Sequence, residues 1–356
     1  RPFQPGEEEA IVELLELAFD GWPKFDLCCS PLEHWRWKYK ANPLITSQIA
    51  VGVSNHIIIG CSHSLLSRIR TGNRVFPCSQ GGDAAVHPDF RRMTIFRKLI
   101  NLKIKMGKES RVQVHYCATN PILRKSLSKF YCWFPHIVMN LFRVHDIDLH
   151  LRKQPVKYAF IYKSGFHLIK LANQWRNTLR LYRPSSCDFH IGKITQFDER
   201  IESFWEEIKD HYNFIMERSR EYLNWRYCDH RSGDYLVKIA QTDAKILGYM
   251  VLRINKHQID YPIGYIVDLL TLPNRLDVTN ALVEDAVNYF DDHHINIIIC
   301  LIVKNHPYKA IFERNGFITK RERIPLFYRG YTEVEELRQL ESSSPSSIHV
   351  AYGDLD

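Results

Sequence analysis

The stretch Asp83-Ala-Ala-Val-His-Pro-Asp-Phe-Arg-Arg-Met-Thr-Ile-Phe96 decides how the chain folds. Its apolar start predicts a short strand over Gly82–His87, which Pro88 ends because proline offers no N–H to a sheet. A helix is predicted over Thr94–Gly107, since apolar residues recur there every three or four positions. The strand thus crosses a basic turn into a helix N-terminus, where free N–H groups favour a phosphate. Solvated arginines at a plain helix start explain the charge equally well.

Similar elements surround this segment on both sides. In the first half we expect helices over Glu7–Phe19 and Pro121–Phe130, and strands over Ile57–Leu66, Arg111–Ala118 and Phe134–Val144. The second half repeats this order, with these predicted strands and helices: Leu236–Ala240, Ile246–Ile254, Gly264–Leu270, helix Val278–Phe290, Ile295–Val303, helix Pro307–Asn315 and Pro325–Arg329. Strands come first and then alternate with helices, so each half is predicted to be a mixed α/β sheet.

Landmark residues recur between the halves at nearly constant spacing and indicate an internal duplication. Trp37 is followed 23 residues later by Gly60, and Trp225 is followed 23 residues later by Gly248. Asp83 and Asn120 are 37 residues apart, as are Asp268 and Asn305, and an offset of 185 maps Leu141-Phe142 onto Leu326-Phe327. Two unrelated α/β segments that share common dipeptides are the alternative. The sequence therefore predicts a tandem α/β (α+β) protein.

The positive charge is concentrated between the halves. The chain carries 48 basic and 40 acidic residues, and Leu151–Cys187 holds eight basic residues and no acidic one. A helical apolar stripe from Leu168 to Tyr182, with Trp175 in it, predicts a connector helix buried on one side between the lobes. A membrane or nucleic-acid surface would also explain the missing acids, but we prefer the connector.

Composition excludes several classes of protein. Hydrophobic residues make up 45% and charged residues 25%, as in ordinary globular proteins. The longest apolar runs, such as Ile297–Val303, fall far short of a membrane-spanning helix. Nine cysteines without a Cys-x-x-Cys pair indicate free thiols in a reducing cytoplasm rather than zinc sites or a disulfide framework, and we expect no metal.

The segment that opens this section resembles motif A of the GNAT acyltransferase superfamily. In that motif a strand reading Ala-Val-His-Pro leads into an Arg-x-x-Gly-x-Gly/Ala turn around the pyrophosphate of acetyl-CoA. Arg91 matches the arginine, whereas Thr94 and Phe96 replace the glycines. A threonine side chain there narrows the approach of the phosphate or donates its hydroxyl to it. The resemblance implies an acetyl-CoA site formed by Ala85, Val86, His87, Arg91, Arg92, Met93, Thr94, Ile95, Phe96 and Asn120.

Asn120 and the helix after it resemble motif B of the same superfamily. Leu127 stands where the usual general-acid tyrosine would fall, and Tyr131-Cys132 replaces the closing Gly-Phe. The second half keeps Asn305 and Asn315-Gly316-Phe317, but its Thr271–Val278 segment contains no phosphate-binding turn. The resemblance covers about residues 1–145 and 190–330 and is similar to the two-lobed GNAT proteins. It implies a CoA-binding lobe over 1–147, a basic connector over 148–188, a second GNAT-like lobe over 189–330 and an acidic, serine-rich tail over 331–356.

The catalytic candidates are Asp83, His115 and Tyr116, with Glu33 as a further base and Tyr131 as a further acid. Each has a structural alternative. Asp268 occupies the equivalent place in the second half, which favours a structural role for both aspartates. His115 faces either the cleft or the core, and a strand tyrosine is more often half-buried packing.

Two further regions carry expectations. The aromatic cluster Trp22, Trp35, Trp37 and Tyr39 is predicted to be a helix packed on the sheet, since Trp225-Arg226-Tyr227 recurs in the other half; an acceptor pocket is the alternative. After Gly330 we expect a flexible linker over Ser342–Ser347, with Ile348–Tyr352 either docked as a strand or disordered.

The favoured function is direct transfer of an acetyl group from acetyl-CoA to a small-molecule or peptide amine, by a cytoplasmic enzyme without a metal. One alternative is a non-catalytic acyl-CoA-binding or interaction protein with a degenerate GNAT fold. Another is a tandem-GNAT aminoacyltransferase, which would use charged tRNA. The sequence identifies neither the acceptor nor the oligomeric state.

Overall fold

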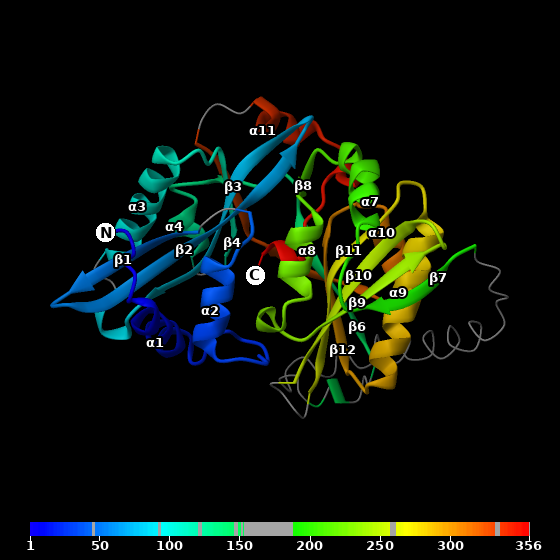
Figure 1. Cartoon of the computed structure of the whole chain (residues 1–356), viewed down its shortest axis with the longest axis horizontal. Coiled ribbons are helices and arrows are strands. Elements are labelled where there is room, and N and C mark those ends of the chain that lie inside the picture. The colour runs from blue at the N-terminus through cyan, green and yellow to red at the C-terminus, as the bar shows by residue number, and fades with distance from the viewer. Residues whose placement is uncertain are drawn as a thin grey trace.

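The structure is a computed structural model and describes residues 1–44, 47–91, 94–119, 123–145, 149–150, 152, 188–256, 261–331 and 335–355, with only the backbone at 320–322. Two mixed sheets form two lobes that lie side by side (Figure 1). The predicted pair of mixed α/β lobes is therefore confirmed. The connector over 148–188, including Trp175, lies almost wholly outside the described residues and stays a prediction.

The first sheet contains seven strands, most of them antiparallel. Its order is β1 (Gln48–Ser54), β2 (Ile57–Thr71), β3 (Arg74–Val86), β4 (Val114–Ala118), β14 (Leu326–Gly330) and β5 (Cys132–Trp133), with β8 (Phe214–Met216) paired to β2. Glycine and turn residues between Thr71 and Arg74 connect β2 to β3 as a long hairpin. This hairpin extends well beyond the strands predicted over Ile57–Leu66 and Gly82–His87.

The second sheet also contains seven strands. Its order is β13 (Ile318–Ile324), β6 (Val138–Val144), β12 (Ile297–Val303), β11 (Ile263–Thr271), β10 (Ile246–Asn255), β9 (Tyr235–Gln241) and β7 (His190–Ile194). The helix α9 (Leu276–Asp292) covers β9 to β11, and α7 (Arg200–Ile208) packs on β10. α10 (Tyr308–Arg314) packs against α9.

Apart from the short β8, which pairs with β2, each sheet receives one strand from the other half of the chain. β6 comes from the first half of the sequence, yet it lies between β12 and β13 of the second sheet. β14 comes from the second half and lies between β4 and β5 of the first sheet. An approximate two-fold relation between the lobes follows, in which each half completes the sheet of the other.

Helices cover both faces of the first sheet. α1 (Glu8–Phe19) and α2 (Pro31–Lys40) bury Ile11, Leu15 and Trp35 against one face. On the other face lie α3 (Ile95–Glu109) and the short α4 (Arg124–Leu127). A Cβ at Gly60 of β2 would come within 3.0 Å of the Ile95 side chain, so this glycine lets α3 lie close to the sheet.

The lobes meet at a pair of tryptophans. Trp37 in α2 stacks on Trp225 in α8 (Arg220–Tyr227), with ring centroids 4.8 Å apart. Each indole N–H donates to the backbone carbonyl of the other tryptophan, at 3.1 and 3.3 Å. Trp35 and Tyr39 are fully buried as well. The prediction that this aromatic cluster packs α2 rather than forming an open pocket is confirmed.

The C-terminal tail is folded, contrary to the predicted flexible linker. It forms α11 (Glu335–Gln339) and three single turns, and Ile348 bridges to Phe214. Leu337, Leu340 and Val350 join a core cluster that includes Val114 of the first sheet and Leu301 of the second. The serine run is short, and the apolar residues on both sides of it pack between the two sheets. The chain ends between the lobes (Figure 1).

None of the helices in the described part of the chain has the length and hydrophobicity needed to span a bilayer. The eight cysteines described are all free thiols.

Candidate active site

The strands β3 and β4 separate in the middle of the first sheet. They pair in parallel from Cys78–Val114 to Gln80–Tyr116, and both continue beyond the last pair. Just past that point β3 carries a bulge: between its pairs with Cys61 and His63, β2 advances by two residues and β3 by three. Asp83 takes a positive φ of 41° at this bulge. Such a bulge redirects the chain and leaves backbone groups outside the sheet ladder, which is a common feature next to active sites.

A groove and a cavity follow from this separation. The groove has a volume of about 800 Å³ and lies between β3, the start of α3 and α4. The cavity has a volume of about 190 Å³ and lies beneath it between β3, β4, α3 and α4. Phe19, Ala84, Phe96 and Leu123 line both spaces, so the groove leads into the cavity.

The groove is positively charged. Arg91, Arg97 and Lys129 line it, and none of the described residues that line it is acidic. The Arg91 guanidinium donates to the carbonyls of Ala18 and Val86, which holds it at the rim. Arg97 and Lys129 form no ion pair with an acid within the described ranges. Together with the N-terminus of α3, these cations suit a ligand that carries phosphates.

The groove contains most of the predicted CoA-binding residues. These are Ala85, Val86, Arg91, Thr94, Ile95 and Phe96. His87 is not among them, because its Nδ1 accepts from the Asp89 N–H in the turn after β3. Arg92, Met93 and Asn120 lie outside the described residues. Arg97, one of the cations that the sequence places at this helix start, also lines the groove. Sequence reasoning missed Phe19, Phe90, Ser126 and Lys129, which reach the groove from α1, the turn before α3 and the α4 region.

Thr94 adopts a left-handed conformation at the start of α3. Its φ is 59° and its ψ is 4°, and its side chain makes no capping hydrogen bond. This backbone region is unfavourable for a β-branched residue and natural for glycine. The conformation therefore matches that of a glycine turn, although the residue is a threonine.

The Asp83 carboxylate points away from the cavity. It accepts hydrogen bonds from Lys38 at 2.8 Å, from the Trp22 indole at 3.0 Å and from the Tyr39 hydroxyl, all on the α1–α2 face. Burial alone would raise the pKa of this carboxyl, but Lys38 and the hydrogen bonds outweigh burial and hold the pKa well below its usual range. Asp83 therefore stays ionised at neutral pH and is a poor proton acceptor.

His115 lines the cavity from β4. Its Nδ1 shares a hydrogen bond of 2.7 Å with the Ser79 hydroxyl, and its ring stacks on Tyr131. Burial lowers the pKa of His115 well below its ordinary value, with help from the nearby cations Lys103 and Arg329. The imidazole is therefore neutral. A Cβ at Gly81 would lie 3.1 Å from its Nε2, so the glycine makes room for the ring.

Tyr116 lies on the other face of β4, because neighbouring residues of a strand alternate. Its hydroxyl donates to the Asp354 carbonyl at 2.8 Å in the seam between the lobes. The structure thus moves Tyr116 from the candidate site into the core. Glu33 is also structural, since it forms the capping box of α2 with Ser30. Tyr131 does line the cavity, one helical turn after Leu127, and burial raises its pKa far above the ordinary value.

Lys103 is a cavity residue that sequence reasoning missed. It lies on the buried side of α3, is 4% exposed, and its ammonium donates to the His63 carbonyl at 2.6 Å. Burial lowers its pKa to about 8. The sequence signal was its position one turn from Leu99 and Ile100 on the apolar stripe of the helix.

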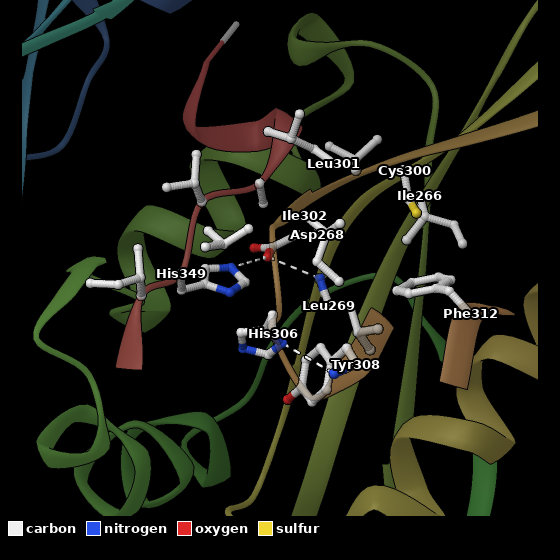
Figure 2. A pocket seen from close by; sticks show the side chains of 15 residues that line it. Ile266, Asp268, Leu269, Cys300, Leu301, Ile302, His306, Tyr308, Phe312 and His349 are labelled. Carbon is white, nitrogen blue, oxygen red and sulfur yellow. Dashed lines mark hydrogen bonds and ion pairs between the residues drawn. The ribbon is translucent and has the colours of Figure 1, made fainter. Parts of the chain in front are cut away.

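In the second lobe, the opening between strands that corresponds to the cavity of the first lobe is closed. β11 and β12 also separate, after Ile266–Cys300, and a bulge again lies beside Asp268. Here the tail fills the opening: Figure 2 shows His349 directed at the Asp268 carboxylate, 3.0 Å away. The remaining cavity is only about 30 Å³. At the start of α9, Arg275 is paired with Asp277 and Asp188, so this arginine is not free to bind a phosphate.

Comparisons with known proteins agree with this geometry. Residues 1–125 match the family described as acetyltransferase (GNAT) domain. No curated protein sequence matches the chain significantly. Among the described residues, no group of His, Cys, Asp or Glu side chains is arranged to hold a metal ion.

Solved structures resemble the whole chain. A conserved protein of unknown function from Enterococcus faecalis V583, described as a probable N-acyltransferase, is 11% identical, with 93% of this chain and 72% of that one covered and a TM-score of 0.63. A tandem GNAT protein from the clavulanic acid biosynthesis pathway is 13% identical, with 94% and 98% covered and a TM-score of 0.58. Eis1 from Mycobacterium abscessus is 12% identical, with 93% and 73% covered and a TM-score of 0.55. At these identities the likeness shows a shared tandem fold.

Proposed function

We propose that the chain is a two-lobed protein of the GNAT superfamily, and that its first lobe binds an acyl-CoA and transfers the acyl group to an amine. The observation that carries this proposal is the groove at the start of α3, lined by Arg91, Arg97 and Lys129, which leads past a bulged strand into a cavity. Phosphates of CoA would lie against Arg91, Arg97 and the N-terminus of α3. The pantetheine arm would follow β3 toward Asp83.

The reaction would be a direct one. The amine nitrogen attacks the thioester carbonyl carbon, an amide bond forms, and the carbon–sulfur bond breaks to release the CoA thiol. Backbone N–H groups at the bulge would stabilise the negative charge that develops on the carbonyl oxygen.

We assign protonation of the departing thiolate to Tyr131 on the basis of its position in the cavity. It remains protonated at neutral pH, lines the cavity and lies one turn beyond Leu127, where relatives carry their acid. Replacing Tyr131 by Phe should therefore lower kcat by about 100-fold, the usual size of a general-acid contribution, with the Kd for acetyl-CoA unchanged.

Tyr116→Phe is the matched control for this prediction. It removes a hydroxyl of the same kind from the other face of the sheet and should cost about 1 kcal/mol of stability without changing kcat. Equal kcat values for Tyr131→Phe and the parent would remove Tyr131 from the chemistry.

The overall proposal is tested in two steps. Calorimetric titration with acetyl-CoA measures binding, and release of free thiol with mixed amines measures transfer. Binding without thiol release would support the second candidate, a non-catalytic acyl-CoA-binding protein. The replacement of the usual tyrosine by Leu127 favours that candidate. Absence of binding would exclude both.

Thr94 offers a separate test of the groove. Thr94→Gly should raise the free energy of unfolding by about 1 kcal/mol, because it relieves a β-branched residue at positive φ. It should also tighten CoA binding several-fold, since the backbone is then free to approach a phosphate. Thr94→Ala removes the hydroxyl but keeps the Cβ. Weaker binding by both variants would mean instead that the hydroxyl donates to the ligand.

A further inference from the structure

Polar groups gather at the inner end of the cavity, away from the groove. Along β3 the groove is lined by Ala84–Val86 and the cavity by Gly81–Ala84, next to the point where β3 and β4 pair. Along α3 the groove ends near Arg97, whereas Lys103 lies deeper. The ammonium of Lys103, the hydroxyl of Ser62 and the imidazole of His115 therefore face the part of the cavity that lies beyond the bulge.

The Lys103 ammonium has no acidic partner, and the Ser62 hydroxyl has no hydrogen-bond partner, among the described residues. Within the described residues, no acid forms an ion pair with Lys103, whose ammonium has only the His63 carbonyl. The Asp83 carboxylate is turned to the other face and is held there by Lys38. The hydroxyl of Ser62 is fully buried and has no hydrogen-bond partner in the described part of the chain. Asp83 lies near enough to raise the pKa of Lys103 through its charge, but it forms no ion pair with the ammonium. A buried cation without an acid in contact with it is costly, so this site favours an anion.

Apolar side chains line much of the path from the groove to this polar end. Phe96, Ile100, Leu123 and Leu127 line it between the groove and the polar end. An acetyl group is small and uncharged, so it would use neither the length of the cavity nor Lys103. A short methylene chain that ends in a carboxylate would use both.

We propose that the acyl donor is a CoA thioester of a dicarboxylic acid, with succinyl-CoA as the representative, and that Lys103 and Ser62 bind its terminal carboxylate. This inference rests on the proposed function and specifies the substrate class of the same site. In the transfer, the amine attacks the thioester carbonyl, the carbon–sulfur bond breaks, and the amine proton leaves with the CoA thiol. The distal carboxylate keeps its charge throughout and becomes part of the amide product.

The test compares binding of succinyl-CoA and butanoyl-CoA, which have acyl chains of four carbons and differ in one terminal carboxylate. Calorimetry on the full-length protein, without an acceptor, should give a Kd for succinyl-CoA at least about tenfold lower than that for butanoyl-CoA. In Lys103→Met this preference should disappear, while free CoA binds as in the parent. Lys105→Met is the matched control: it lies on the exposed side of the same helix and should keep the preference.

Each outcome decides between distinct cases. If the parent binds butanoyl-CoA as tightly as succinyl-CoA, the inference fails although the proposed function stands. If no CoA species binds, the proposed function fails and the inference with it. A preference that persists in Lys103→Met would also overturn the inference. Acylation of Lys103 itself, located by peptide mass spectrometry after incubation with succinyl-CoA, would overturn it as well. Ser62→Ala should reduce the preference without abolishing it, which gives a second test should Lys103→Met fold poorly.

Discussion

Replacing Arg91 and Arg97 together by Glu should weaken acetyl-CoA binding by roughly 1,000-fold. Each guanidinium lies on the groove at the start of α3 and would make a charge-assisted contact to a phosphate. Such contacts contribute about 1.5–3 kcal/mol each, and two of them account for a loss of this size. The glutamates add repulsion between like charges. Calorimetry at one fixed salt concentration measures the effect.

The control must carry the same change in charge. Lys193→Glu with Lys304→Glu also alters two exposed cations, but both lie in the second lobe, where the tail closes the equivalent place. This double variant should bind acetyl-CoA almost as the parent does. A similar affinity for the parent and both double variants would place the CoA site outside this groove.

Replacing Arg218 by Met should lower the free energy of unfolding by about 3–5 kcal/mol. Arg218 is fully buried between two carboxylates: its Nε donates to Asp268 at 3.1 Å and its Nη2 to Asp354 at 2.7 Å. Methionine fills a similar volume but leaves both carboxylates without their cation. The hydroxyls of Tyr249 and Tyr227 and the ring of His349 still contact Asp268, yet none of them replaces the guanidinium.

Urea unfolding measures this loss. Arg220→Met is the control, because Arg220 lies two residues further on and its side chain is 38% exposed, so that its replacement should change stability by less than about 0.5 kcal/mol. An Arg218→Met protein as stable as the parent would show that the buried network does not hold the tail to the lobes.

Much of the fold could be predicted because its signals are local. The apolar stripe in the sequence of α3 is the face that this helix buries. The two tryptophans that recur in the sequence, Trp37 and Trp225, stack on each other where the lobes meet. The strand exchange could not be predicted. Apolar alternation in Leu141-Phe142 and in Leu326-Phe327 determines which face of a strand is buried, not which sheet the strand joins. Since the two segments are so alike, either one suits either sheet.

The candidate site was predicted less completely, for two physical reasons. A strand places neighbours on opposite faces, so only one of His115 and Tyr116 could face the cavity, and the sequence does not say which. A lysine on an apolar stripe usually extends its charge to solvent along the helix surface. Lys103 does not, because it lies in the middle of α3 beneath β2. The tail was misjudged because its serines resemble a linker, while Leu337 and Ile348 are too far apart to form a pattern.

The exchange of β6 and β14 also has a consequence during synthesis on the ribosome. The first sheet needs β14 between β4 and β5, and β14 is translated long after β4. At 5 to 20 residues per second, the nascent first half waits roughly 10 to 40 seconds for the strand that completes it. During that time the edge of β4 is open to other chains. Aggregation of the nascent chain through this edge is therefore the expected cost of the strand exchange.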